Sequence, residues 1–131
     1  MTAPKSLREL FDDIGLKEVG STDGSLVMEM PVNEQVTNTS GGLQGGLIAT
    51  MADVAAGQLA ARETTFGHGI ATSDLFVRYL RPVTVGPARA VARILRTGGR
   101  SVVVQVEIFR GNDGEIAAIA TVGFAAIRRP D

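Results

Sequence analysis

An amide, a pair of glycines and a carboxylate stand at regular intervals in the first half of the chain. Asn38 is followed six residues later by Gln44-Gly45-Gly46, and Asp53 comes nine residues after Gln44. An apolar run begins at the glycines, so we expect them to open a helix whose first N–H groups lack intrahelical acceptors. Such N–H groups, aided by the helix dipole, can stabilise the oxyanion of a carbonyl under attack, and glycine lets that carbonyl approach closely.

Asp53 is the second candidate for chemistry. It stands two turns into the expected helix, beyond any capping position, and no basic residue lies within one turn of it. Burying a carboxylate costs free energy unless a partner compensates, so we favour a functional role for Asp53 over that of a structural acid.

Helix geometry limits how the glycines and the acid cooperate. Eight residues separate Gly45 from Asp53, a rise of about 12 Å, so one helix cannot direct both groups at one carbonyl. If two copies of the helix lie antiparallel across a twofold axis, Gly45 of one subunit meets Asp53 of the other. The spacing therefore predicts a homodimer with two shared sites.

The remaining elements are expected from periodicity and turn residues. Residues 6–9 form a capping box for a short helix that ends near Gly15, and Asp23-Gly24 favours a hairpin turn. Glycine-rich turns separate four later segments of β-strand character. The expected hairpin strands are residues 16–22 and 25–32, the long helix is residues 45–62, and the later strands are residues 70–80, 87–97, 101–110 and 115–128.

The long helix determines the expected fold class. Apolar residues cover nearly every direction around it, which is typical of a buried helix, and the rest of the chain offers mainly strands to cover it. Residues 101–108 alternate, with Val102, Val104, Val106 and Ile108 on one face. We therefore expect one α+β domain over residues 1–131, with a curled antiparallel sheet wrapped around one long buried helix.

Composition excludes several classes of function. The chain has no cysteine, which excludes disulfides, thiol nucleophiles and cysteine zinc sites, and its single histidine excludes multi-histidine metal sites. Residues 1–65 carry 4 basic and 9 acidic groups, whereas residues 66–131 carry 9 basic groups, all arginine, and 5 acidic ones. Because these arginines are scattered and aromatic residues are only 5% of the chain, we expect a small phosphorylated ligand and no nucleic acid.

Neither a membrane span nor a secretory signal is expected. The longest apolar run, residues 45–61, is short for a span and contains Asp53. The N-terminus has no apolar core followed by a small-residue cleavage site, so we expect a cytoplasmic protein.

Residues 38–53, with their Asn, Gly-Gly and acidic positions, resemble the hotdog-fold acyl-CoA thioesterases, specifically the phenylacetyl-CoA thioesterase-like group. Residues 72–82 look like the family's strand after the helix, and residues 96–101 are similar to its next hairpin. One departure is Gln44, which stands where the family most often has histidine and, unlike histidine, cannot titrate.

The resemblance implies hydrolysis of an acyl-CoA to a carboxylic acid and free CoA, without a cofactor or metal. Asp53 would act as general base or as nucleophile, and both roles stay open. The Gly45 N–H would bind the carbonyl oxygen, with Asn38, Gln44 and Thr72 as further catalytic candidates. The CoA moiety would contact Gly46, Arg100 and Ser101. The implied assembly is a dimer, or a dimer of dimers, whose two hotdogs form one continuous sheet with sites at the subunit interface.

Alternative functions follow from the same residues. Because Gln44 departs from the family pattern, a non-catalytic acyl-CoA binding hotdog protein is the alternative to a thioesterase. A hotdog dehydratase or hydratase comes third, because such enzymes pair a histidine with an acid and His68 lies after the helix. The apolar residues permit aryl or medium-chain acyl groups equally.

Overall fold

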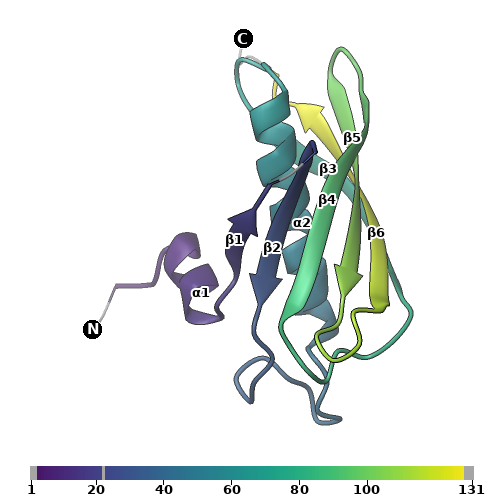
Figure 1. Cartoon of the computed structure of the whole chain (residues 1–131). Helices are drawn as coiled ribbons and strands as arrows, with labels where there is room; N and C mark the ends of the chain where they lie inside the picture. Colours follow the sequence, from purple (N-terminus) through teal and green to yellow (C-terminus); the bar gives the residue numbers. More distant parts are fainter. Residues whose placement is uncertain (1–2, 22, 129–131) are drawn as a thin grey trace.

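The computed structural model describes residues 3–21 and 23–128, which form two helices and one six-stranded antiparallel sheet (Figure 1). The strand order is β1-β2-β4-β5-β6-β3, so β3 lies at one edge of the sheet. The sheet curls around α2, which confirms the expected hotdog arrangement. The elements are α1 (Leu7–Asp13), β1 (Lys17–Gly20), β2 (Ser25–Met30), α2 (Gly45–Glu63), β3 (Ile70–Tyr79), β4 (Ala88–Thr97), β5 (Ser101–Phe109) and β6 (Ile116–Ala126).

Local signals account for the first elements. The Ser6 hydroxyl accepts a hydrogen bond from the Glu9 N–H, and the Glu9 carboxylate accepts one from the Ser6 N–H, which is the expected capping box of α1. Asp23 and Gly24 have φ values of 53° and 76°, and two positive φ values are what the tight hairpin turn between β1 and β2 requires. All the expected helices and strands are present, with ends that differ by only a few residues.

Small side chains let the sheet approach α2 closely. The α2 residues that face the sheet include Ala52, Ala55, Ala56 and Ala60, and all of them are fully buried. The inner face of the sheet is also rich in alanine on β4 and β6, while β5 supplies the expected branched residues. These buried inner-face residues are Ala88, Ala90, Ala92, Val102, Val104, Val106, Ile108, Ala118 and Ala120.

The structure confirms a long helix packed in the curl of the sheet, but within a single chain the sheet does not cover every side of α2. Thr50, Asp53 and Gly57 are only half-buried, and Gln58 and Arg62 are exposed. The sheet covers one side of the helix, and α1, none of whose residues is buried, does not cover the other (Figure 1). This second side of α2 therefore leaves mainly polar and small residues accessible.

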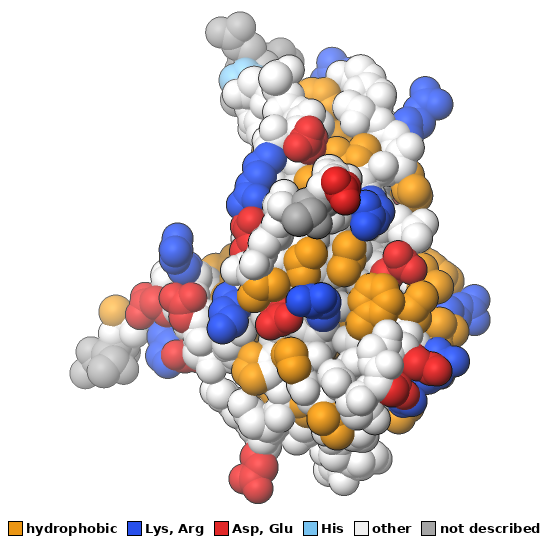
Figure 2. Space-filling view, viewed as in Figure 1, with side chains coloured by type: hydrophobic (Ala, Val, Ile, Leu, Met, Phe, Trp, Pro, Cys, Tyr) orange, Lys and Arg blue, Asp and Glu red, His pale blue; other side chains and the backbone are white. Residues whose placement is uncertain are grey.

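The outer face of the sheet carries hydrophobic side chains interleaved with charged side chains of both signs (Figure 2). Glu29 of β2 and Arg89 of β4, for example, are paired across the strands at 3.3 Å. Among the residues described, neither helix combines the length and the hydropathy that a membrane-spanning helix requires.

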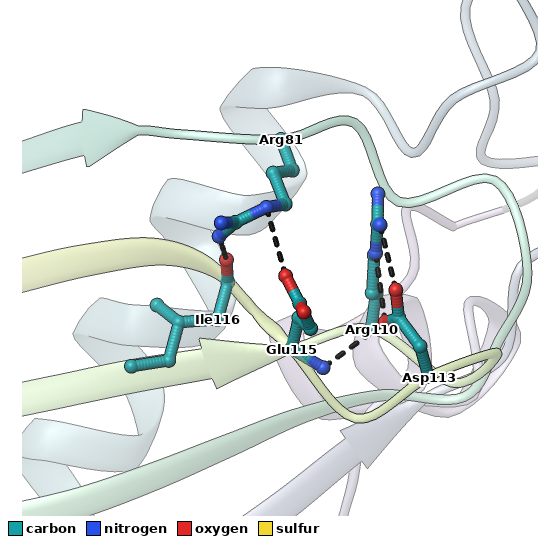
Figure 3. Close-up of polar contacts among 5 residues, drawn as sticks. All are labelled: Arg81, Arg110, Asp113, Glu115 and Ile116. Atoms are coloured by element: carbon teal, nitrogen blue, oxygen red, sulfur yellow. Dashed lines mark hydrogen bonds and ion pairs between the residues drawn. The ribbon is translucent and has the colours of Figure 1, made fainter.

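An ion pair closes the turn between β5 and β6 (Figure 3). Arg110 donates to both carboxylate oxygens of Asp113, at 2.9 and 2.7 Å, and the Glu115 N–H donates to the same carboxylate at 3.0 Å. The hydrogen bonds from Arg110, followed by that from Glu115, lower the pKa of Asp113 to about 2. The folded protein therefore favours the ionised carboxylate.

We expect Asp113→Asn to lower the Tm at neutral pH, because the amide cannot pair with the Arg110 guanidinium. The lowered pKa stabilises the folded state above the ordinary aspartate pKa, and this contribution is lost as the pH falls towards 2. The Tm difference between wild type and variant, followed by circular dichroism, should therefore shrink between pH 4 and pH 2. Asp12→Asn, at a carboxylate with no ion pair among the described residues, is the control. A difference that stays constant to pH 2 contradicts the assignment.

Candidate active site

The start of α2 presents two free N–H groups. Gly45 and Gly46 are the first two helical residues, and neither N–H has an acceptor among the described residues. The chain just before them is held on both sides, because the Leu43 N–H donates to Val83 and the Gln44 N–H donates to Val36, at 2.8 and 2.9 Å. The unpaired donors therefore belong to a fixed segment.

Gln44 is the N-cap of this helix. Its side-chain oxygen accepts a hydrogen bond from the Leu47 N–H at 2.8 Å. A Cβ at Gly46 would stand 2.9 Å from that oxygen, so any larger residue at Gly46 would displace the cap. The structure thus explains how an amide serves at this position: it satisfies one of the first N–H groups of α2 and leaves those of the two glycines unpaired.

Asn38 shares an open pocket of about 330 Å³ with Gly45. The Asn38 side-chain oxygen accepts hydrogen bonds from the Ser40 and Gly42 N–H groups, at 2.9 and 3.2 Å, and this closes the loop before α2. Apolar side chains make up much of the remaining wall. The structure therefore brings two of the predicted site residues together. The pocket is also lined by Gly42, Leu43, Ile48, Tyr79, Leu80, Arg81 and Pro82.

Tyr79 is a pocket residue whose contact with Gly45 the sequence analysis missed. Its hydroxyl donates to the Gly45 carbonyl at 2.6 Å. A Cβ at Gly45 would lie 3.6 Å from the Tyr79 ring, which is ordinary van der Waals contact. The signal available in the sequence was that Tyr79 is the only tyrosine in the chain, at the end of a strand that follows the helix.

Arg81 borders the same pocket, but its guanidinium is already paired with groups of this chain (Figure 3). Its guanidinium lies 3.1 Å from the Glu115 carboxylate and donates to the Ile116 carbonyl at 2.6 Å. Arg81 therefore fastens the chain after β3 to the start of β6, and an anionic ligand would have to compete with these contacts.

Asp53 lies in the third turn of α2, where Thr72 of β3 contacts it. The Thr72 hydroxyl donates to one carboxylate oxygen of Asp53 at 2.8 Å. No basic side chain forms an ion pair with Asp53 in the part of the chain that the structure describes. The carboxylate is thus oriented by a hydroxyl, keeps its charge unpaired, and has a second oxygen available for chemistry.

A β-bulge places Thr72 on the helix side of β3. The pairing with β6 shifts by one residue between Thr72 and Asp74, so Thr72 stands opposite buried Phe124 and Tyr79 opposite buried Ala118. Both side chains therefore reach α2, at points separated by the rise of about 12 Å between Asp53 and Gly45. One chain does not bring its acid and its free N–H groups together.

Arg100 and Ser101 are exposed at the start of β5, about 50 residues after Asp53 in the sequence. Arg100 lines a second open pocket, of about 370 Å³, together with Phe66 and His68 from the loop after α2. Arg100 forms no ion pair with any described residue. In contrast to Arg81, it can bind an anion without breaking an existing contact. Gly46, the other residue predicted to contact CoA, lies at the start of α2 and is also exposed.

No group of three or more histidine or acidic side chains gathers into a metal site within residues 3–21 and 23–128.

Comparison with known proteins gives consistent matches. Residues 41–117 match the model of the thioesterase superfamily. "Putative esterase SSO2140" of Saccharolobus solfataricus is 30% identical over 124 residues, which are 95% of this chain and 87% of that protein. Acyl-coenzyme A thioesterase 13 of Mus musculus is 31% identical over 101 residues, 76% of this chain and 71% of that protein. The crystal structure of the BH2602 protein from Bacillus halodurans with CoA is 30% identical, with a TM-score of 0.82 over 92% of this chain and 80% of that one.

Proposed function

This chain belongs to the thioesterase superfamily, and on that basis we propose that it hydrolyses an acyl-CoA, with an aryl or medium-chain acyl group, to a carboxylic acid and free CoA. The observation that carries the proposal is the unpaired Gly45 N–H, which opens α2 at the wall of an apolar pocket. As water or a carboxylate attacks the thioester, negative charge develops on the carbonyl oxygen. A fixed N–H at a helix N-terminus stabilises that charge without reorganising.

Asp53 supplies the attacking group. It acts as general base on water, or as nucleophile that forms a mixed anhydride, which water then hydrolyses. Its hydrogen bond from Thr72 engages one oxygen, and the other accepts no hydrogen bond among the described residues. Because the Asn38 oxygen already accepts two backbone N–H groups, Asn38 positions water or substrate through its side-chain NH₂.

Two chains build each site. Gly45 and Asp53 are about 12 Å apart along α2, and one side of that helix is incompletely covered. Within residues 3–21 and 23–128, strand β3 pairs only with β6, so its outer edge can continue the sheet into a second copy. A twofold axis beside β3 makes the two α2 helices antiparallel and brings Gly45 of one subunit to Asp53 of the partner subunit. A dimer, alone or within a dimer of dimers, therefore carries two sites.

The nucleotide end of CoA binds at Arg100 and Ser101, and the thioester end passes Gly46. Support comes from the unpaired Arg100 guanidinium beside an open pocket, and from the relative whose structure contains CoA. Guanidinium groups bind phosphate in a bidentate manner, which suits the phosphates of a CoA nucleotide.

Asp53→Asn should lower kcat by about 10² or more, because the amide can neither accept a proton nor attack the carbonyl. The fold should remain, since the amide oxygen still accepts the Thr72 hydrogen bond. Release of free CoA thiol from a panel of acyl-CoAs measures the effect. Glu63→Gln, at an exposed acid on the same helix, is the matched control. Unchanged turnover in a folded Asp53→Asn protein contradicts the catalytic assignment, and binding without turnover in the wild type favours the non-catalytic alternative.

Mixed dimers test the shared site. Gly45→Pro removes the donor N–H at a position where proline suits the helix, and Gly45→Ala keeps the N–H as its control. Gly45→Pro and Asp53→Asn should each be inactive, whereas co-refolding the two should restore activity, because each mixed dimer contains one intact site. Random pairing then recovers about a quarter of the wild-type sites. An inactive mixture, with mixed dimers verified by mass, shows that each site belongs to one subunit.

Arg100→Glu should weaken the use of full CoA thioesters, with a raised KM, and change the use of pantetheine thioesters little, because these lack the nucleotide phosphates. Thiol release measured with both substrate series checks this, and added salt should reduce the wild-type preference for CoA. Arg93→Glu, at an exposed arginine of β4, controls for the change in net charge. Equal losses on both series indicate that Arg100 supports folding instead of recognition.

A further inference from the structure

Tyr79 presents an aromatic surface in the pocket where the carbonyl would bind. Half of its surface is exposed, although it lies on the inner face of β3. It borders the pocket together with apolar side chains that include Ile48, Leu80 and Pro82. This lining suits an acyl group better than the amides of pantetheine, because burying an amide without a hydrogen-bond partner costs free energy.

The Tyr79 ring is held in place by its own hydroxyl. The hydrogen bond of 2.6 Å to the Gly45 carbonyl fixes the far end of the side chain, while β3 fixes its near end. Gly45 belongs to the first turn of α2, so the ring is attached to the same segment that carries the free N–H. The hydrogen bond therefore holds the ring beside the first turn of α2, next to the Gly45 N–H.

We infer that Tyr79 determines which acyl groups the site accepts, selecting those that are unbranched at the carbon next to the carbonyl. This inference rests on the proposed function. A carbonyl oxygen held by the Gly45 N–H brings that carbon close to the ring, which itself lies in van der Waals contact with the Cβ position of Gly45. A straight or flat acyl group packs along the ring, whereas a branch at this carbon overlaps it, and the tethered ring cannot move aside.

The chain offers a direct probe of this contact. Tyr79 is its only tyrosine and it has no tryptophan, so intrinsic tyrosine fluorescence reports Tyr79 alone. The ligands are pantetheine ketones, in which a CH₂ group between sulfur and carbonyl prevents hydrolysis and no adenine absorbs the exciting light. A straight-chain ketone should change the fluorescence and bind more tightly than its branched isomer. Binding seen by calorimetry without a fluorescence change overturns the inference.

Kinetics then test selection. The ratio of kcat/KM for butyryl-CoA to that for isobutyryl-CoA compares two acyl groups of equal composition. Tyr79→Ala should lower this ratio by about tenfold or more, because the wall is removed. Tyr79→Phe should lower the ratio by less than Tyr79→Ala does, because the ring remains but, without the hydrogen bond to Gly45, can move aside. Phe76→Ala, on the opposite face of the same strand, should leave the ratio unchanged.

Separate outcomes distinguish this inference from the proposed function. If the wild type hydrolyses no thioester, the proposed function fails, and the fluorescence titration still tests the wall. If the wild type is active and folded Tyr79→Ala keeps the wild-type ratio, Tyr79 does not select the acyl group, although the thioesterase stands. Tyr79→Leu, which retains apolar volume without a flat ring, replaces Tyr79→Ala if circular dichroism shows the latter unfolded. A ratio unchanged by Tyr79→Leu likewise overturns the inference.

Discussion

Close packing of α2 against an alanine-lined sheet is the constraint on which the rest of this structure depends. Alanines on both surfaces, such as Ala55 on the helix and Ala90 on β4, have no long side chains to separate the two backbones. The helix is thereby fixed in rotation and in height relative to the strands. Thr72 can then reach Asp53, and Tyr79 can reach Gly45, with short polar contacts at both places.

Helix α2 both packs against the sheet and carries the candidate catalytic groups, and different parts of the helix serve these two roles. The side facing the sheet is uniformly apolar, whereas the unpaired N–H groups are at its first turn and the carboxylate is on its half-covered side. Gln44 caps the helix without occupying the glycine N–H groups, so the donors stay available. The helix also holds β1, because Arg62 donates to both carboxylate oxygens of Glu18 and so lowers the pKa of that acid.

The fold could be predicted from periodicity because local signals agree with the structure. The capping box at Ser6 begins a helix, Asp23-Gly24 forms a hairpin turn, and the alternating residues of β5 form a strand. The spacing of Gly45 and Asp53 was also readable, since helix geometry is regular. The residues that hydrogen-bond to Gly45 and Asp53, which are Tyr79 and Thr72, could not be predicted from the sequence. Strict alternation would put Thr72 and Tyr79 on opposite faces of β3, and only the bulge brings both to the helix. Glutamine is likewise an uncommon N-cap, so the role of Gln44 required the structure.

The bulge in β3 has a further consequence, for aggregation. An edge strand offers unpaired N–H and C=O groups to any passing strand, and regular edges invite promiscuous pairing. In β3, the extra residue Ser73 interrupts the regular backbone, and opposite it the Asp74 carboxylate occupies the space that a Cβ at Gly123 would need, at 2.3 Å. The bulge thus divides the edge into two regular stretches, residues 70–72 and 74–79, each long enough only for a short partner strand. The distortion that aims the threonine at the acid thus also protects the free edge against indiscriminate self-association.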